Sequence, residues 1–267
     1  MGPCPIFVIN LTAAGERWQR ISAHLRGLAL DGFQRLEAVD GRRLSSEQRD
    51  AKVDRAFFEG WYGRAPSAGE VGCTLSHLGA YETLLDGKAP FALVLEDDAE
   101  LTNHVLPLLE QDALRTWLAA DTPRVLLLTQ ADRYLARPLL ELTEPYRIAV
   151  VRNAWLAHGY LINRAGARLL LRKQSPIRFL VDDWMDLNML WGVDVRCVLP
   201  NPIHLHETAQ NSSLDDGRES VRTAARPRSF QRAIRRSFRR VADALFYKLL
   251  FGIRKGESQG VSADSAE

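Results

Sequence analysis

Short runs of apolar residues recur along the chain and predict buried strands. Runs of this length are typical of strands covered on both faces of an α/β sheet, and the clearest of them is Phe91–Leu95. The predicted strands lie at 5–11, 33–39, 91–95, 124–129, 148–151, 155–162 and 193–199.

Helical periodicity fills most of the intervals between these runs. Apolar residues repeat there at steps of three and four, which is the spacing of one helix face. The predicted helices lie at 12–27, 44–47, 69–85, 105–118, 163–171 and 184–191. Alternating strands and helices favour an α/β fold, and a strand followed at once by a helix is typical of a nucleotide-binding unit.

Three segments show neither pattern. The aromatic-rich segment 54–69 is expected to be irregular, either as a lid over a site or as a loop packed on the body. Residues 131–147 are expected to form a polar connector, and residues 200–213 a polar loop.

Three consecutive acids, Glu96, Asp97 and Asp98, follow the apolar run 91–95 directly. Open α/β sheets bind ligands at the C-terminal ends of their strands. Adjacent carboxylates repel one another, and a buried carboxylate is costly unless a cation pairs with it. Carboxylate oxygens suit Mg²⁺ or Mn²⁺ together with substrate phosphates. We therefore expect this cluster to bind a metal. Whether Glu96 or Asp97 faces the metal is open, and the spacing favours Glu96 beside Asp98 because alternate residues of an extended chain point the same way.

A second acidic group contains Asp182, Asp183 and Asp186. Either Asp182 or Asp183 can act as the base that takes a proton from an attacking hydroxyl, or can simply cap the helix that follows. Downstream, the imidazole of His206 (or of His204) can add a nitrogen ligand that favours Mn²⁺, although a single late histidine is more often a surface group.

Polar residues near the first strand and in the 69–85 helix are further candidates. Arg17 lies with Asn10 near the C-terminal end of the first strand, where it can reach a phosphate or a base, or simply face solvent. Ser76 and His77 lie in the middle of a helix, where adjacent residues do not face each other, so they are not expected to form a hydrolase dyad.

Several blocks of the chain resemble glycosyltransferase family 25, in the order found in that family. The resemblance covers about residues 5–214 and is specific only when the blocks are taken together. The blocks are Val8–Leu11 with Arg17, Phe33–Gly41, Gly69–His77, Ala92–Asp98, Tyr160–Ala167, Val181–Asp183 and Gln210–Ser213. The family includes bacterial lipopolysaccharide and lipooligosaccharide core glycosyltransferases, which are related to collagen galactosyltransferases.

This resemblance implies a GT-A fold, with one nucleotide-binding domain built on a mostly parallel, mixed sheet. It also implies an inverting mechanism and a nucleotide-sugar donor, often UDP-galactose. It makes the acids at 96–98 the family's form of the DxD metal motif, with Asp98 the best metal ligand. It places Asp182 and Asp183 in a second functional acid cluster. The saccharide acceptor is not defined by it. The donor site it implies contains Asn10, Arg17, Ser76, His77, Asp97, Gln210 and Ser213.

The distribution of charge separates a tail from the body. Residues 222–255 hold 11 Arg or Lys and one acid, whereas residues 1–221 hold 24 basic and 29 acidic residues. Apolar residues from Phe230 to Ile253 follow one helical stripe flanked by arginines. A basic amphipathic helix is typical of proteins that bind an anionic membrane surface, and packing on the body or on another subunit is the alternative. Nucleic acid is not expected as a partner, because the body is acidic.

These observations predict a catalytic domain at 1–221, a membrane-associating tail at 222–255 and a disordered end at 256–267. No apolar stretch approaches the roughly 18 residues of a membrane span, the start lacks a basic signal region, and the three cysteines offer no disulfide framework. We expect a cytoplasmic protein that is peripheral on the inner face of the bacterial cytoplasmic membrane.

The expected function is therefore that of a metal-dependent glycosyltransferase. A sugar nucleotidyltransferase is an alternative, but the sequence shows no Gly-rich triphosphate loop near Leu11. A non-catalytic, membrane-docked scaffold of the same fold is another alternative, against which the intact acids of both clusters argue.

Overall fold

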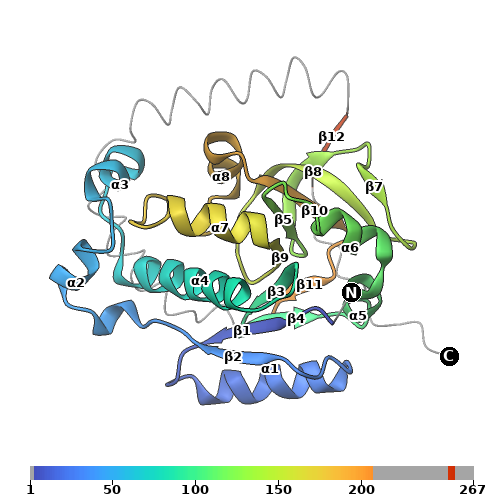
Figure 1. Cartoon of the computed structure of the whole chain (residues 1–267), viewed down its shortest axis with the longest axis horizontal. Coiled ribbons are helices and arrows are strands. Elements are labelled where there is room, and N and C mark those ends of the chain that lie inside the picture. The colour runs from blue at the N-terminus through green and yellow to red at the C-terminus, as the bar shows by residue number, and fades with distance from the viewer. Residues whose placement is uncertain (1–2, 207–251, 256–267) are drawn as a thin grey trace.

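The computed structural model describes residues 3–206 and 252–255, and its central element is a ten-stranded sheet (Figure 1). Along the sheet the strands follow the order β12-β6-β8-β10-β5-β9-β3-β1-β2, and β7 pairs with β8 beside this path. These strands are β1 (Ile6–Asn10), β2 (Gln34–Glu37), β3 (Phe91–Glu96), β5 (Arg124–Leu127), β6 (Ala131–Leu135), β7 (Leu140–Glu141), β8 (Arg147–Ala154), β9 (Gly159–Asn163), β10 (Asp194–Leu199) and β12 (Ile253–Lys255). A separate two-stranded sheet joins β4 (Ala99–Leu101) to β11 (Ile203–Leu205).

The helices connect these strands and cover both faces of the sheet. They are α1 (Gly15–Gly27), α2 (Ser46–Asp50), α3 (Arg55–Tyr62), α4 (Ala68–Asp86), α5 (Val105–Glu110), α6 (Asp112–Leu118), α7 (Arg164–Lys173) and α8 (Trp184–Trp191), with a short 3-10 helix, η1 (Gly41–Arg43). Figure 1 shows α4 and α7 side by side on one face, and α1 beyond β1 and β2.

The sheet is mixed, with most strands running one way. β1 is parallel to both β2 and β3, and β10 is parallel to β5. β9 runs antiparallel between β3 and β5, and β8 runs antiparallel to β6, β7 and β10. Followed across the sheet, these pairings leave β8, β9 and β12 reversed relative to the other seven described strands. The predicted α/β class with a mostly parallel, mixed sheet is therefore confirmed.

Alternate residues of β3 enter two separate apolar layers, because neighbouring side chains on a strand point to opposite faces. Val94 packs in one layer with residues of α3, α4, α7 and α8, among them Phe58. Leu93 packs in the other layer with residues of α1, α5 and α6, among them Ile21 and Leu108. The apolar run at 91–95 is thus buried on both faces, as its sequence predicts.

The segment 54–69 is not irregular, because it contains α3. Asp54 caps this helix by accepting a hydrogen bond from the Phe57 backbone N–H at 3.1 Å. Aromatic rings four residues apart contact each other, with centroids 4.3 Å apart for Phe58 and Tyr62. The prediction was wrong because this four-residue aromatic spacing is itself a helical pattern.

The segment 131–147 is not a simple connector either, since it contains β6 and β7. Ala131 and Leu135 are buried where β6 pairs with β8, whereas Asp132 is exposed. The prediction was wrong because a strand near the sheet edge carries few apolar residues, and its pairing depends on a partner distant in sequence.

Other boundaries differ by smaller amounts. The helix expected at 105–118 is divided at Gln111, whose ψ of 123° is extended, and the strand expected at 155–162 begins only at Gly159. The capping role predicted for Asn163 is confirmed, since its side chain accepts from the Gly166 backbone N–H at 2.8 Å.

The basic tail lies mostly outside the described residues. Of the predicted stripe, Ile253 lies in β12, which pairs antiparallel with β6, so the helix does not extend to this residue. The backbone of Ile253–Lys255 takes up the hydrogen-bonding edge of β6 instead. The rest of the predicted helix and residues 256–267 lie outside the described part. Among the helices that are described, none has the length and apolar character that crossing a membrane requires.

Candidate active site

The C-terminal ends of β1 and β3 lie side by side and define the candidate site. Their parallel register pairs Ile9 with Glu96, so Asn10 and Asp97 follow at the same edge of the sheet. Helix α1 starts just after β1 and carries Arg17 to this edge. This is the edge at which open α/β sheets bind ligands.

Arg17 and Asn10 hold the carboxylate of Asp97. One Nη of Arg17 lies 2.5 Å from Asp97 Oδ1 and 2.9 Å from Asp98 Oδ2. Asn10 Nδ2 donates to Asp97 Oδ2 at 2.6 Å, and Asn10 Oδ1 in turn accepts from Arg35 Nε at 3.0 Å. Burial raises the pKa of Asp97 even though Arg17 and Asn10 act to lower it.

Asp98 is the least satisfied acid of the cluster. Its side chain is buried, and its Oδ1 has no hydrogen-bond partner among the described residues. Burial, followed by the charge of Glu96, raises the pKa of Asp98 to about 7 although Arg17 opposes this. The backbone N–H of His206 donates to the Asp98 carbonyl at 2.9 Å, so His206 lies next to the acid through the pairing of β11 with β4. A buried oxygen without a partner is costly and is suited to receive a cation.

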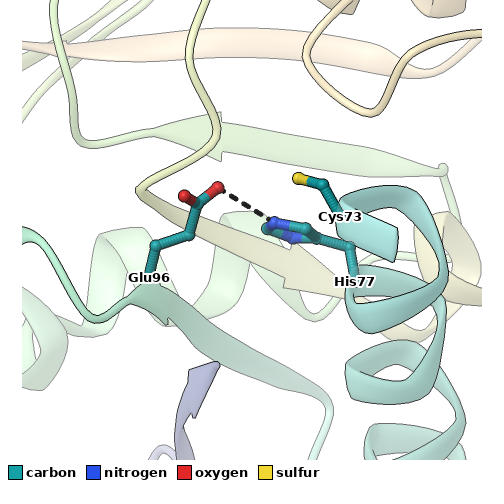
Figure 2. Close-up of side chains that lie close together, drawn as sticks. All are labelled: Cys73, His77 and Glu96. Atoms are coloured by element: carbon teal, nitrogen blue, oxygen red, sulfur yellow. Dashed lines mark hydrogen bonds and ion pairs between the residues drawn. The ribbon is translucent and has the colours of Figure 1, made fainter. Parts of the chain in front are cut away.

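Glu96 faces α4 rather than Arg17. Its Oε1 lies 3.1 Å from His77 Nε2 (Figure 2). The other ring nitrogen of His77 lies 2.7 Å from the Tyr160 hydroxyl. Tyr160 is bonded in turn to the Tyr81 hydroxyl at 2.9 Å. Burial acts to raise the pKa of Glu96, but the hydrogen bond and charge of His77 outweigh it, so the pKa lies below its usual range.

Ser76 lines the same pocket, but its hydroxyl is hydrogen-bonded to two backbone groups of the fold. Its Oγ donates to the Gly72 carbonyl at 2.7 Å and accepts from the Val39 backbone N–H at 2.8 Å. Ser76 therefore joins α4 to the segment that follows β2, and it positions the pocket wall.

The two candidate bases occupy different surroundings. Asp182 lines the pocket, whereas Asp183 is buried and accepts a hydrogen bond from the Tyr62 hydroxyl. The same hydroxyl accepts from the Leu180 backbone N–H at 2.9 Å. Asp183 also precedes α8 at the N-cap position. Of this pair, Asp182 is the acid that lines the pocket.

His158 belongs to the site but was not predicted from the sequence. Glu96 N–H donates to the His158 carbonyl at 3.1 Å, and the register of β3 with β9 places the two residues opposite each other. Opposed residues of an antiparallel pair point to the same face. Neither nitrogen of His158 has a hydrogen-bond partner among the described residues, and burial lowers its pKa to about 4. The sequence prediction missed His158 because it placed this residue inside a strand at 155–162, whereas β9 starts only at Gly159.

One pocket with a volume of about 230 Å³ brings most of these residues together. Of the residues predicted from the sequence, it is lined by Asn10, Arg17, Ser76, His77, Glu96, Asp97, Asp98 and Asp182. Asp183 and the His206 side chain are not part of this lining, and Gln210 and Ser213 lie outside the described residues.

Fold and pocket together define an α/β protein with an acid-lined site at the carboxyl edge of its sheet, where open α/β sheets bind their ligands. Residues 4–185 match glycosyltransferase family 25 (LPS biosynthesis protein), and the chain belongs to this family. The resemblance noted in the sequence is therefore confirmed.

Relatives in this family differ in length and in name. A bovine protein named probable inactive glycosyltransferase 25 family member 3 is 31% identical, over 70% of this chain and 32% of its own length. Procollagen galactosyltransferase 1 of Danio rerio is 26% identical, over 69% of this chain and 31% of its own. A putative glycosyltransferase of Haemophilus influenzae is 28% identical, over 69% of each chain. The chain spans about a third of the length of the first curated relatives that it matches.

Among solved structures, the galactosyltransferase LgtC in complex with donor and acceptor sugar analogs aligns with 72% of this chain and 72% of its own. The TM-score is 0.38 and the sequence identity is 14%.

Proposed function

We propose that this protein is an inverting, metal-dependent glycosyltransferase with a GT-A fold. It transfers a sugar, galactose from UDP-galactose, to a saccharide acceptor during the synthesis of lipopolysaccharide, lipooligosaccharide or another cell-surface glycan. The family description names lipopolysaccharide biosynthesis, and one relative is named a procollagen galactosyltransferase; both support this choice.

The observation that carries the proposal is the convergence of acids and a cation from three separate parts of the chain on one pocket. The acids at the C-terminal end of β3, the cation Arg17 and the acid Asp182 line the same 230 Å³ space, although they lie far apart in sequence. A nucleotide-sugar donor needs positive charge at its diphosphate, and an attacking hydroxyl needs a base.

A divalent cation, Mn²⁺ or Mg²⁺, fits the residues present. The unpartnered Oδ1 of Asp98 is a ready oxygen ligand, and His158 is a buried imidazole without a hydrogen-bond partner among the described residues. Asp98 and Glu96 would hold the ion, with His206 or His158 as a nitrogen ligand that favours Mn²⁺. When bound, the ion neutralises charge that develops on the leaving diphosphate.

Asp182 then acts as the general base. The acceptor hydroxyl attacks the anomeric carbon from the face opposite the diphosphate, and its proton passes to the Asp182 carboxylate. A new C–O bond forms while the bond from carbon to the diphosphate oxygen breaks, and its electron pair stays on the diphosphate. Attack from the opposite face inverts the anomeric configuration. Asp183, which is bonded to Tyr62, positions the segment that carries Asp182.

Release of UDP from UDP-galactose in the presence of Mn²⁺ and a lipooligosaccharide acceptor tests the proposal. We expect Asp182→Asn to lower turnover by about 100-fold or more, because a positioned base contributes roughly that factor. Asp121→Asn is the matched control, since this aspartate is exposed and lies outside the pocket lining. Turnover by Asp182→Asn equal to that of the unaltered protein would contradict the assignment of the base.

Two alternatives predict different products. A sugar nucleotidyltransferase would release pyrophosphate from a nucleoside triphosphate and a sugar phosphate. A non-catalytic scaffold would release neither product and would show no Mn²⁺-dependent binding of UDP-sugars. The bovine relative carries the word inactive in its name, so turnover has to be measured directly.

A further inference from the structure

We propose that Cys73, His77 and Glu96 form a binding site for Zn²⁺ on the wall of the pocket. This ligand set shares Glu96 with the proposed Mn²⁺ site and differs from it in chemistry, because Cys73 and His77 add sulfur and nitrogen. The Glu96 oxygen that faces His77 is Oε1, so the other carboxylate oxygen is left for the ion at Asp98. The affinity for Zn²⁺ does not depend on the proposed transferase function, because it follows from these three side chains alone.

The geometry of α4 brings the first two ligands together. Cys73 and His77 are four residues apart on this helix, so they share one face and lie on successive turns. Figure 2 shows both side chains directed toward Glu96, which ends β3. The sulfur, one imidazole nitrogen and one carboxylate oxygen all lie within 4.8 Å of one another, and His77 Nε2 is 3.1 Å from Glu96 Oε1.

Only a small contraction turns this cluster into a coordination shell. Zn–N and Zn–S bonds of about 2.0 and 2.3 Å in a tetrahedron place the ligand atoms about 3.3–3.7 Å apart. The nitrogen and oxygen, 3.1 Å apart, are slightly closer than this spacing, and the Cys73 sulfur, within 4.8 Å of both, has to approach by at most about 1.5 Å. Rotation of the Cys73 side chain can supply this movement, because Cys73 is only partly buried.

A hydrogen bond to Tyr160 orients the imidazole of His77. The Tyr160 hydroxyl lies 2.7 Å from His77 Nδ1 and can either donate to this nitrogen or accept from it. Metal binding replaces the Nε2 proton that His77 otherwise shares with Glu96. The ring proton is then on Nδ1, the Tyr160 hydroxyl accepts it, and the lone pair of Nε2 faces the metal. Tyr160 keeps a partner in the Tyr81 hydroxyl at 2.9 Å in either arrangement. An outer hydrogen bond of this kind is the usual support of a metal-binding histidine.

The ligand types select the metal. A thiolate and an imidazole prefer Zn²⁺ to Mn²⁺ or Mg²⁺, which prefer carboxylate oxygens. Three protein ligands leave the fourth tetrahedral position open, as at catalytic zinc sites. All three residues line the pocket, so a ligand in the pocket can reach this fourth position.

Titration of the metal-free, full-length protein with Co²⁺, a spectroscopic substitute for Zn²⁺, tests the site. We expect one equivalent of Co²⁺ to produce a thiolate-to-cobalt charge-transfer band in the near ultraviolet, and one equivalent of Zn²⁺ to abolish it. Mn²⁺ at the same concentration is expected to leave the band unchanged.

Single substitutions test which side chains give rise to the charge-transfer band. Cys73→Ser is expected to abolish the band, and Glu96→Gln to keep it while weakening Co²⁺ binding by about tenfold or more. Cys4→Ser is the matched control, because this cysteine is also only partly buried and lies outside the cluster; its band is expected to match that of the unaltered protein.

Two results would overturn the proposal. One is a protein that binds Co²⁺ without a charge-transfer band, or does not bind it. The other is a band that persists in Cys73→Ser. If Cys73→Ser fails to fold, Glu96→Gln decides the matter, since unchanged Co²⁺ affinity in that variant excludes Glu96 as a ligand.

Discussion

At the scale of single residues, the buried carboxyl of Asp98 affects the folding stability of the protein. Its pKa is raised to about 7, chiefly by burial, so folding penalises its charged form. The unfolded carboxyl titrates near the ordinary value of 3.8. Between about pH 4 and pH 7 the carboxyl of Asp98 is therefore protonated in the native state and ionised in the unfolded state. The free energy of unfolding that is linked to Asp98 is fully present below pH 4, falls as the pH rises and is lost above about pH 7.

We predict that Asp98→Asn stabilises the metal-free protein at pH 8 by on the order of 2–4 kcal/mol, since one pKa unit corresponds to about 1.4 kcal/mol. Near pH 3 the difference from the unaltered protein should vanish, because Asp98 is then largely protonated in both states. Urea unfolding at the two pH values measures this.

Mn²⁺ should reverse the order of stability in the same experiment. A ligand that binds only the native state raises its stability, so saturating Mn²⁺ is expected to raise the unfolding midpoint of the unaltered protein but not that of Asp98→Asn. A variant less stable than the unaltered protein at pH 8 without metal would show that the charged carboxylate is well compensated.

At the scale of elements, α4 is positioned by glycines that allow backbone to touch backbone. A Cβ added at Gly72 would lie 2.4 Å from the Val39 carbonyl oxygen and 2.6 Å from the Gly41 nitrogen. Such distances force the helix away from the segment after β2. The same helix face carries Ser76, which accepts a hydrogen bond from Val39.

We predict that Gly72→Ala lowers the free energy of unfolding by about 2–3 kcal/mol, the usual cost of overpacking a rigid contact. Gly79→Ala is the control on the same helix. No heavy atom lies within 4 Å of its added Cβ, so this variant should gain about 0.5–1 kcal/mol from the better helix propensity of alanine. Equal unfolding midpoints for the two variants would show that α4 can shift without cost.

How far the elements can be predicted depends on how local their determinants are. The burial of 91–95 and the cap at Asn163 follow from neighbouring residues, and both are confirmed. The strands β6 and β12 depend on pairing with distant partners, which a local pattern does not contain. Helix α3 was missed for another reason, because its apolar signal comes from aromatics and not from aliphatic residues.

At the scale of the whole molecule, the part of the candidate site that was predictable from the sequence is the set of polar residues at the ends of the strands. Parallel β1 and β3 bring Asn10 and Asp97 to one edge, as expected for an α/β sheet. The role of Glu96 was harder to predict, since its contact with His77 depends on how α4 crosses the sheet. His158 was missed because its proximity to Glu96 arises from the antiparallel insertion of β9 between β3 and β5.

We also propose that the basic segment 222–255 docks the protein on an anionic membrane surface, on the cytoplasmic face of the bacterial inner membrane. This segment holds 11 Arg or Lys and one acid, while residues 1–221 are net acidic, so attraction to anionic lipids would be concentrated in the tail. Such a location would hold the pocket near a lipid-linked saccharide acceptor.

Co-sedimentation with vesicles of phosphatidylcholine and phosphatidylglycerol tests this docking. Each basic residue near an anionic surface contributes about 1 kcal/mol, so replacing five arginines by glutamine should weaken binding by about 100-fold or more. The residues to replace are Arg232, Arg235, Arg236, Arg239 and Arg240.

A control with the same change of net charge replaces five exposed arginines of the body, namely Arg26, Arg43, Arg137, Arg168 and Arg172. The control should bind like the unaltered protein, and neither should bind vesicles of phosphatidylcholine alone. Equal loss in both variants would mean that net charge, and not the tail, determines the attraction.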